Sequence, residues 1–347
     1  MHIAIVSTHG LSADAPAIAR ELGRGHSVTV YTRSASDIKG VRVEQVPAGP
    51  AGELSDNDLL PYISDFSDGL KKCWRQDRPD VIHAHSWTGG LAAIAGSDGL
   101  GVPVTQTFHH GDAPSAPVQR LERAIGRRAR AVIAACAGEE SELIKLGVPR
   151  RNIAVVPSGV DVERFRRRGP AAPRGERARM LHIGDAGAAM AIQALASVPG
   201  AELVVAGGDD AMIARLGILA RDKGVEDRVE LLGRVAHANM PKLIRSADVA
   251  LALAPTAPTG MAALEAMACG IPVIVSATGA HLDAVVHGVT GYHVRRPAEV
   301  VVRMRQLLGD RTLRTALGFA GVDRARSRYS LERVSQELIR VYENICA

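Results

Sequence analysis

The sequence has few aromatic side chains and no long apolar run. Aromatic residues occupy 3% of its 347 positions, whereas hydrophobic residues occupy 46%. The core must therefore be built from Val, Ile, Leu and Ala, a composition typical of parallel sheets covered by helices on both faces. No stretch reaches about 18 apolar residues, so we expect no transmembrane segment. The length exceeds what one core usually holds and predicts two domains.

Cysteine is also scarce, and its four positions follow neither metal-site nor disulfide spacing. We therefore expect Cys73, Cys136, Cys269 and Cys346 to be free thiols in a reducing compartment, which predicts a cytoplasmic protein. The opening MHIAIVSTHG lacks the length and basic flank of a signal peptide and is typical of a strand. The net charge of +5 is mild. It suits an anionic substrate or an acidic surface, and we expect no nucleic-acid partner.

Two kinds of ligand motif are missing. The predicted first strand, His2–Ser7, leads into a loop with one glycine, Gly10, and no G-x-G-x-x-G follows it, which argues against a dehydrogenase. His83 and His85 share a face of a predicted strand, but no third ligand is near, so we expect no metal site. His109 and His110 follow the predicted strand Val102–Phe108. A histidine just past a buried strand is well placed for chemistry, and it also suits a turn cap.

Strands and helices alternate in both halves of the chain, which predicts an α/β fold of two doubly wound domains. A basic run, Arg164–Arg168, followed by prolines and glycines separates the halves. We interpret this run as a solvated linker, with contact to phospholipid or another anion as the alternative. The predicted domains are residues 1–168, residues 176–326, and a C-terminal helical segment, residues 327–347.

The stretch from Pro255 to Gly279 organises the second half. It predicts a loop, a short helix of small residues from Met261 to Cys269, a turn at Gly270 and a buried strand. The one carboxylate of the helix, Glu265, lies one turn inside it. Such a corner could hold an anion at the helix N-terminus, or it could be a well-packed βαβ unit without a ligand.

Several motifs together resemble a known family. These are SGVD at residues 158–161, LLGRV at residues 231–235, SADV at residues 246–249, ALEAMACGIPV at residues 263–273 and GVTG at residues 288–291. They stand in the order found in the family 4 glycosyltransferases of the GT-B fold. The resemblance covers nearly the whole chain, and the ALEAMACGIPV block is its most specific part.

The resemblance implies two Rossmann-like domains, an N-terminal one for the acceptor and a C-terminal one for a nucleoside-diphosphate sugar. It implies transfer with retention of the anomeric configuration, no metal or other cofactor, and a last helix that crosses back to the N-terminal domain. It assigns catalysis to His109, the ribose hydroxyls to Glu265, and the acceptor side to His85 and His110. The remaining nucleotide-sugar residues that it implies are Gly10, Gly184, Gly233, Arg234, Val235, Gly260 and Met261.

Three departures from the family pattern concern the donor site. Ala257 replaces a glutamate eight positions before Glu265. Asp185 follows Gly184 where the family has arginine, and the next loop, residues 186–190, lacks the usual lysine. Gly10 is the only glycine left in the N-terminal loop. The basic residues near strand ends that are candidates to replace the lost cations are Arg33, Arg234 and Lys242.

Losing two cations and gaining an acid disfavours diphosphate binding. We therefore keep two interpretations: an active transferase acting on a soluble acceptor such as a natural product, and an impaired or inactive relative that acts as a binding partner. A sugar-nucleotide epimerase ranks below both, because it too needs phosphate-binding residues. Peripheral membrane contact is not favoured.

Overall fold

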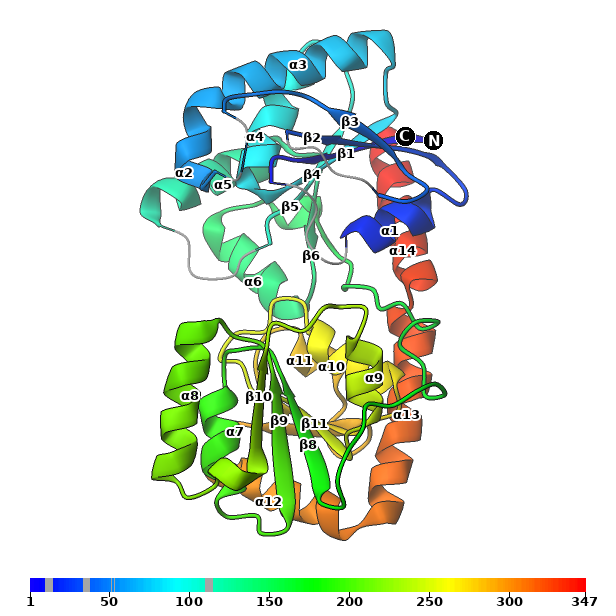
Figure 1. Ribbon diagram of the computed structural model, residues 1–347. Coiled ribbons are helices and arrows are strands. Elements are labelled where there is room, and N and C mark those ends of the chain that lie inside the picture. The colour runs from blue at the N-terminus through cyan, green and yellow to red at the C-terminus, as the bar shows by residue number, and fades with distance from the viewer. Residues whose placement is uncertain (10–14, 34–37, 51, 53, 110–114) are drawn as a thin grey trace. The chain divides into compact units, whose positions relative to one another are not determined.

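The protein forms two compact units in the computed structural model, which describes residues 1–347 except residues 10–14, 34–37, 51, 53 and 110–114 (Figure 1). The N-terminal unit comprises Met1–Gly159 and Leu331–Ala347, and the C-terminal unit comprises Val160–Ser330. The last helix therefore belongs to the N-terminal unit, and the basic run at residues 164–168 lies within the C-terminal unit. Among the helices of the described ranges, none is both long enough and apolar enough to cross a bilayer.

The N-terminal unit contains a seven-stranded parallel sheet in the order β3-β2-β1-β4-β5-β6-β7. Its strands are β1 (His2–Ser7), β2 (Ser27–Thr32), β3 (Arg42–Gln45), β4 (Val81–His85), β5 (Val104–Thr107), β6 (Ala131–Ala134) and β7 (Ile153–Val155). Its helices are α1 (Ala15–Leu22), α2 (Asp56–Leu59), α3 (Ile63–Gln76), α4 (Ser86–Gly96), α5 (Ala116–Arg128), α6 (Ala137–Leu146) and α14 (Leu331–Cys346), with short 3₁₀ turns at Leu60–Tyr62 and Arg150–Asn152.

Alternate residues of β1 belong to the hydrophobic clusters on opposite faces of this sheet. Ala4 and Val6 pack in the cluster that includes Trp74 of α3. Ile3 and Ile5 pack in another cluster with α1 and with Val334, Leu338 and Tyr342 of α14. Successive strand residues point to opposite faces, so a strand covered by helices on both sides becomes a continuous apolar run. Helix α14 thus covers the same face as α1 (Figure 1).

Two features of this unit differ from the periodicity of the sequence. The pattern predicts one helix from Leu59 to Trp74, but the structure has α2, a 3₁₀ turn and α3, with Pro61 in the turn. Proline cannot donate the helical hydrogen bond, and it disfavours helix in the residue before it. Helix α4 has no amphipathic signal, because Gly and Ala residues are buried on several of its sides.

The C-terminal unit contains a six-stranded parallel sheet in the order β10-β9-β8-β11-β12-β13. Its strands are β8 (Ala178–Ile183), β9 (Ala201–Ala206), β10 (Val229–Gly233), β11 (Val249–Ala252), β12 (Val273–Ser276) and β13 (Gly291–Val294). Its helices are α7 (Ala188–Leu195), α8 (Asp210–Asp222), α9 (Met240–Arg245), α10 (Met261–Ala268), α11 (His281–Ala284), α12 (Pro297–Gly309) and α13 (Arg311–Tyr329), with a 3₁₀ turn at Glu226–Arg228.

Each sheet has a point where the chain winds outward in both directions. In the N-terminal unit this point lies between β1 and β4, and in the C-terminal unit it lies between β8 and β11. Connections on the two sides of such a point run to opposite faces, which leaves a crevice at the carboxyl ends of the central strands. The topology therefore predicts one ligand site in each unit, at residues that follow these four strands.

Helices α10 and α13 approach each other through glycine. A Cβ on Gly318 would lie 2.3 Å from the carbonyl oxygen of Gly270, which closes α10 with a φ of +77°. A Cβ on Gly321 would contact Met267. The absence of side chains at both positions of α13 allows the close packing, and this contact fixes α13 along the C-terminal turn of α10.

We expect Gly318→Ala to destabilise the protein by about 1–3 kcal/mol, because backbone must move to admit the methyl group. Gly217 in α8 is a matched control. It is also helical, but a Cβ there meets nothing closer than 4.0 Å. Gly217→Ala should therefore stabilise the protein by up to about 1 kcal/mol, since alanine is the better helix former. Urea unfolding of both variants tests this, and equal shifts would contradict the packing argument.

Candidate functional site

The central crevice of the C-terminal unit has two open helix N-termini. Helices α7 and α10 follow β8 and β11, and each begins at a left-handed glycine, Gly187 (φ +90°) or Gly260 (φ +66°), without a side-chain cap. By contrast, Asp209 caps α8 by accepting a hydrogen bond from the Met212 N–H at 2.8 Å. The first N–H groups of a helix lack intrahelical partners and carry positive partial charge. This pair of helix ends is thus suited to an anion.

Glycine turns bring the main chain close together at the same edge. Gly184, Gly207 and Gly233 all have positive φ. A Cβ on Gly207 would lie 2.7 Å from the carbonyl carbon of Gly184, and the Gly207 N–H donates to the Gly233 carbonyl at 2.8 Å. A Cβ on Gly187 would lie 2.3 Å from the Leu253 carbonyl oxygen. At these glycines the carboxyl edge exposes backbone rather than side chains.

Glu265 lies buried in α10, with 6% of its surface exposed. His237 Nε2 donates to its Oε1 at 2.7 Å, and the His237 ring lies beside Phe165. His237 follows β10 in the loop that begins with Arg234 and Val235. The structure thus brings Glu265 to the segment after Gly233, two elements that the sequence placed at one nucleotide site. The half-exposed His237 was not predicted, and its place just past a strand end is the signal that could have identified it.

Two of the positions that depart from the family pattern, Asp185 and Ala257, form local contacts. Asp185 is exposed, and its Oδ1 accepts the Ala186 N–H at 2.7 Å, so a negative charge lies beside the start of α7. Ala257 is buried, and its carbonyl accepts the Ala280 N–H at 2.7 Å. A Cβ on Gly279 would lie 2.4 Å from that carbonyl oxygen. The main chain at Ala257 is therefore locked against the Thr278–Ala280 turn.

The three basic residues suggested as substitutes differ in their surroundings. Arg33, in the N-terminal unit, donates to the Pro50 carbonyl at 2.7 Å and to the Gly52 carbonyl, so it supports a loop. Lys242 is exposed on α9. Arg234 is exposed directly after β10 and forms no ion pair with any carboxylate of the described ranges. Of the three, Arg234 is the residue that directly follows a strand of the C-terminal sheet, at its carboxyl edge.

In the N-terminal unit three histidine rings stack in a row: His83 and His85 lie on β4, and His109 follows β5. His85 Nδ1 lies 2.6 Å from His109 Nε2, and the ring centroids of His83 and His85 are 4.5 Å apart. His83 bonds to the Tyr342 hydroxyl of α14 at 2.6 Å and to the Thr107 hydroxyl at 2.8 Å. Burial lowers the pKa of His83 to about 3. Burial also lowers the pKa of His85 well below its ordinary value, and the neighbouring His83 and His109 rings lower it further. These two rings are therefore neutral at pH 7.

A second polar cluster lies at the crevice between β1 and β4. Asp56 lies 2.6 Å from His9 Nε2 and accepts the Trp87 indole N–H at 3.0 Å. The hydroxyls of Thr8 and Thr88 are 2.7 Å apart. The hydrogen bond from His9 is the main reason that the pKa of Asp56 falls below its ordinary value. Thr8 and His9 belong to the loop after the predicted first strand, where such sheets bind ligands. Asp56 was not predicted from the sequence, because it lies far along the chain from the strands that it joins.

Two residues at the carboxyl edge of the N-terminal sheet have a strained backbone conformation. Ser86 has φ +63° and His109 has φ +56°, and in the described ranges they are the non-glycine residues with positive φ. Such conformations cost about 1–3 kcal/mol each and cluster at functional sites. Both residues follow central strands of the N-terminal sheet.

Most predicted site residues fall at these two crevices. His85 and His109 lie together in the N-terminal unit. Gly10 and His110 lie outside the described residues. The C-terminal crevice collects the others, which are Gly184, Gly233, Arg234, Val235, Gly260, Met261 and Glu265. No group of three metal-ligating side chains suited to an ion occurs among the described residues.

Two family models match most of the chain. The family described as Glycosyltransferase Family 4 matches residues 16–164, and Glycosyl transferases group 1 matches residues 184–323. D-inositol 3-phosphate glycosyltransferase of Nocardiopsis dassonvillei is 28% identical over an alignment of 386 residues, covering 96% of this chain and 89% of that protein.

Solved structures share the fold over essentially the full length. Sucrose-phosphate synthase from Thermosynechococcus elongatus superposes with a TM-score of 0.87 at 21% identity, covering 99% of this chain and 98% of that one. Anabaena Alr3699/HepE, solved in complex with UDP and glucose, gives a TM-score of 0.83 at 19% identity, covering 99% and 100%.

Burial of His182 predicts how stability depends on pH. The side chain is fully buried on β8, with Nδ1 3.1 Å from the Gly184 carbonyl oxygen, and burial lowers its pKa from 6.5 to about 4. The unfolded chain binds a proton below pH 6.5, whereas the folded chain binds it only near pH 4. The free energy of unfolding should therefore fall as the pH falls through this window, by roughly 3 kcal/mol from this residue.

His182→Asn should reduce the slope of stability against pH by about one proton between pH 6 and pH 4.5. Urea unfolding at several pH values measures this slope. An unchanged slope would mean that His182 titrates alike in the folded and unfolded chains.

Proposed function

This chain belongs to glycosyltransferase family 4 and has the GT-B fold, and from this premise we propose that it transfers a sugar from a nucleoside-diphosphate sugar to a hydroxyl group of a small acceptor. We further propose retention of the anomeric configuration without a required metal. The observation that carries the proposal is the pair of uncapped helix N-termini at the C-terminal crevice, with the buried Glu265 on one of those helices.

Glu265 is suited to the ribose of the donor. A carboxylate accepts hydrogen bonds at both oxygens, and one oxygen already pairs with His237. The other can accept from a ribose hydroxyl, and His237 fixes the carboxylate in place. The neighbouring Gly233–Val235 segment supplies backbone and a half-buried Val235 for the base.

The diphosphate is assigned to the N–H groups that begin α7 and α10, with Arg234 as the nearby cation. Hydrogen-bond donors fixed in place stabilise the charge that grows on a departing diphosphate, because they need no reorganisation during the reaction. The negative charge of Asp185 repels the diphosphate and so weakens its binding. We infer that binding relies on backbone groups more than it does in relatives that keep the arginine and lysine.

His109 is assigned to the reacting sugar or the acceptor, and His85 and His110 to the acceptor side. The 2.6 Å contact with the neutral His85 orients the His109 ring. D-inositol 3-phosphate is the first acceptor to test, because several curated relatives carry that name. The soluble natural-product class remains the broader acceptor proposal.

A second candidate function is a non-catalytic binding protein. The exposed Asp185 beside the start of α7 and the locked Ala257 favour it, because both remove groups that would hold a diphosphate sugar. The two functions differ in whether a nucleoside diphosphate binds and turns over.

Thermal unfolding with UDP, GDP and ADP, and with their sugars, tests the donor. A nucleotide at about 100 times its dissociation constant should add about 2.7 kcal/mol of stability. Glu265→Gln should weaken that nucleotide about tenfold, because a charged acceptor is lost. Glu299→Gln is the control, since Glu299 lies on the surface of α12 and pairs with Arg296. If no nucleotide stabilises the protein, the binding-protein candidate replaces the transferase.

His109→Asn tests the assignment of catalysis. Asparagine tolerates positive φ, so the main chain should keep its conformation. We expect turnover of the matched donor to fall by about 10²-fold or more while nucleotide binding persists. Nucleotide release and thermal unfolding with the nucleotide measure the two effects. Unchanged turnover would remove His109 from the reaction.

A further inference from the structure

A small pocket lined by arginine opens in the C-terminal unit, away from the donor crevice. Its volume is about 200 Å³, and its floor is formed by the residues just before β11 and β12. Strand order places these residues at the amino ends of the parallel strands, whereas the donor crevice lies at the carboxyl ends. Three arginines line it: Arg167, Arg311 and Arg314. Arg167 belongs to the basic run at residues 164–168, which the sequence suggested as a linker, and neither Arg311 nor Arg314 was assigned a role above.

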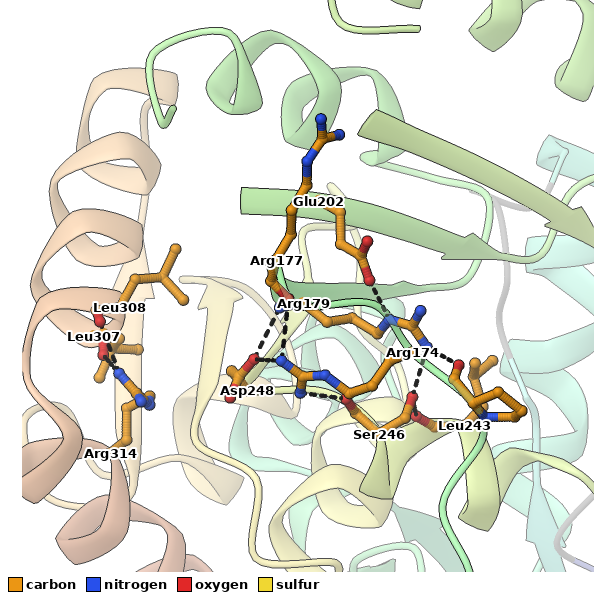
Figure 2. Close-up of polar contacts among 11 residues, drawn as sticks. Arg174, Arg177, Arg179, Glu202, Leu243, Ser246, Asp248, Leu307, Leu308 and Arg314 are labelled. Carbon is orange, nitrogen blue, oxygen red and sulfur yellow. Dashed lines mark hydrogen bonds and ion pairs between the residues drawn. The ribbon is translucent and has the colours of Figure 1, made fainter. Parts of the chain in front are cut away.

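Contacts within the fold position two of these guanidinium groups. Arg314 Nη1 donates to the carbonyls of Leu307 and Leu308 at 2.6 and 2.8 Å, at the end of α12 (Figure 2). Arg167 places its guanidinium carbon 4.1 Å from the centre of the Phe319 ring. Its aliphatic part lies beside Gly270, the residue against which α13 packs. The close packing of α10 and α13 therefore also brings these arginines together.

The charges of the pocket are not balanced by carboxylates. Asp248 is the one acid among the lining residues, and its Oδ2 accepts from Arg174 Nη2 at 2.7 Å and from the Arg179 N–H at 2.8 Å (Figure 2). Arg174 therefore offsets its charge. Across the described ranges, Arg167, Arg311 and Arg314 take part in no ion pair. Like charges that line one small pocket repel each other unless an anion lies between them.

We propose that this pocket binds a phosphate group, supplied either by a phosphate in solution or by a phospholipid headgroup. Planar guanidinium groups match the oxygens of phosphate and bind them with paired hydrogen bonds. The volume is below the roughly 300–1,000 Å³ of pockets that hold drug-sized ligands, so it suits a phosphate group rather than a whole nucleotide. The neighbouring Arg166 and Arg168 are exposed and extend the positive surface.

The proposed phosphate site gives a role to the basic run at residues 164–168. One of its arginines forms a wall of the pocket and stacks on an aromatic ring, rather than lying free in a linker. The site does not depend on the proposed donor or acceptor, since it shares no residue with either crevice.

The first arm of the test titrates inorganic phosphate and follows thermal unfolding and heat of binding. Arg167→Gln with Arg311→Gln removes two lining charges and spares Arg314, which supports α12. Arg215→Gln with Arg221→Gln is the control, because both lie on α8 and the net charge changes equally. We expect saturable binding in the parent and the control, and at least about tenfold weaker binding in the pocket variant. Arg234→Gln should keep the binding, which separates it from the donor crevice.

The second arm measures co-sedimentation with phosphatidylcholine vesicles that contain or lack phosphatidylinositol. Loss of binding to the phosphatidylinositol vesicles in the pocket variant alone identifies the lipid headgroup as the source, and phosphate binding without vesicle binding identifies the soluble source. Equal losses in the pocket and control variants would overturn the proposal, as would a parent that binds neither probe. Sugar transfer is not measured in either arm, so failure here leaves the proposed function standing.

Discussion

Close approach of main chain to main chain is the constraint on which the C-terminal unit depends. At Gly187 and Gly207 on the carboxyl edge, and at Gly318 where α13 meets α10, a single Cβ would collide with backbone. The first two positions leave helix and strand ends bare of side chains, so that N–H groups are what a ligand meets. Gly318 allows α13 to pack against the end of α10, and this packing positions the arginines of the pocket. One device, the missing Cβ, thus shapes both ends of the same sheet.

Charge is distributed unevenly over that unit. At the carboxyl edge, Arg234 is opposed by Asp185, and the helix N-termini supply most of the remaining positive potential. Each helix end contributes about 0.3–1 kcal/mol at an exposed site, which is less than a well-placed arginine gives to a phosphate. At the amino edge, three arginines line one pocket and take part in no ion pair within the described ranges. The proposed donor site therefore has less side-chain positive charge than this pocket, and under that proposal affinity for a nucleotide sugar draws on Glu265 and on contacts to the base.

Much of this architecture could be predicted from the sequence. Apolar runs separated by glycine-rich turns predict the two doubly wound sheets, and the ALEAMACGIPV block predicts α10 with Glu265 one turn inside it. Contacts between distant segments could not be predicted this way. Nothing local to His237 indicates a bond with Glu265, and nothing local to Tyr342 indicates a bond with His83. Helix α4 was not predicted, because burial on several of its sides removes the amphipathic period. The start of α3 was predicted too early, because Pro61 lies in the 3₁₀ turn that precedes it.

The N-terminal unit shows how such distant contacts determine a site. His109 adopts a strained backbone conformation, and its ring is held by His85, which stacks on His83, which in turn bonds to Tyr342 of the last helix. A strained residue persists only where its surroundings determine it strongly. Since burial keeps His83 and His85 neutral, the row holds His109 through hydrogen bonding and stacking without adding positive charge. The last helix is therefore part of what orients His109, although it lies more than two hundred residues away along the chain.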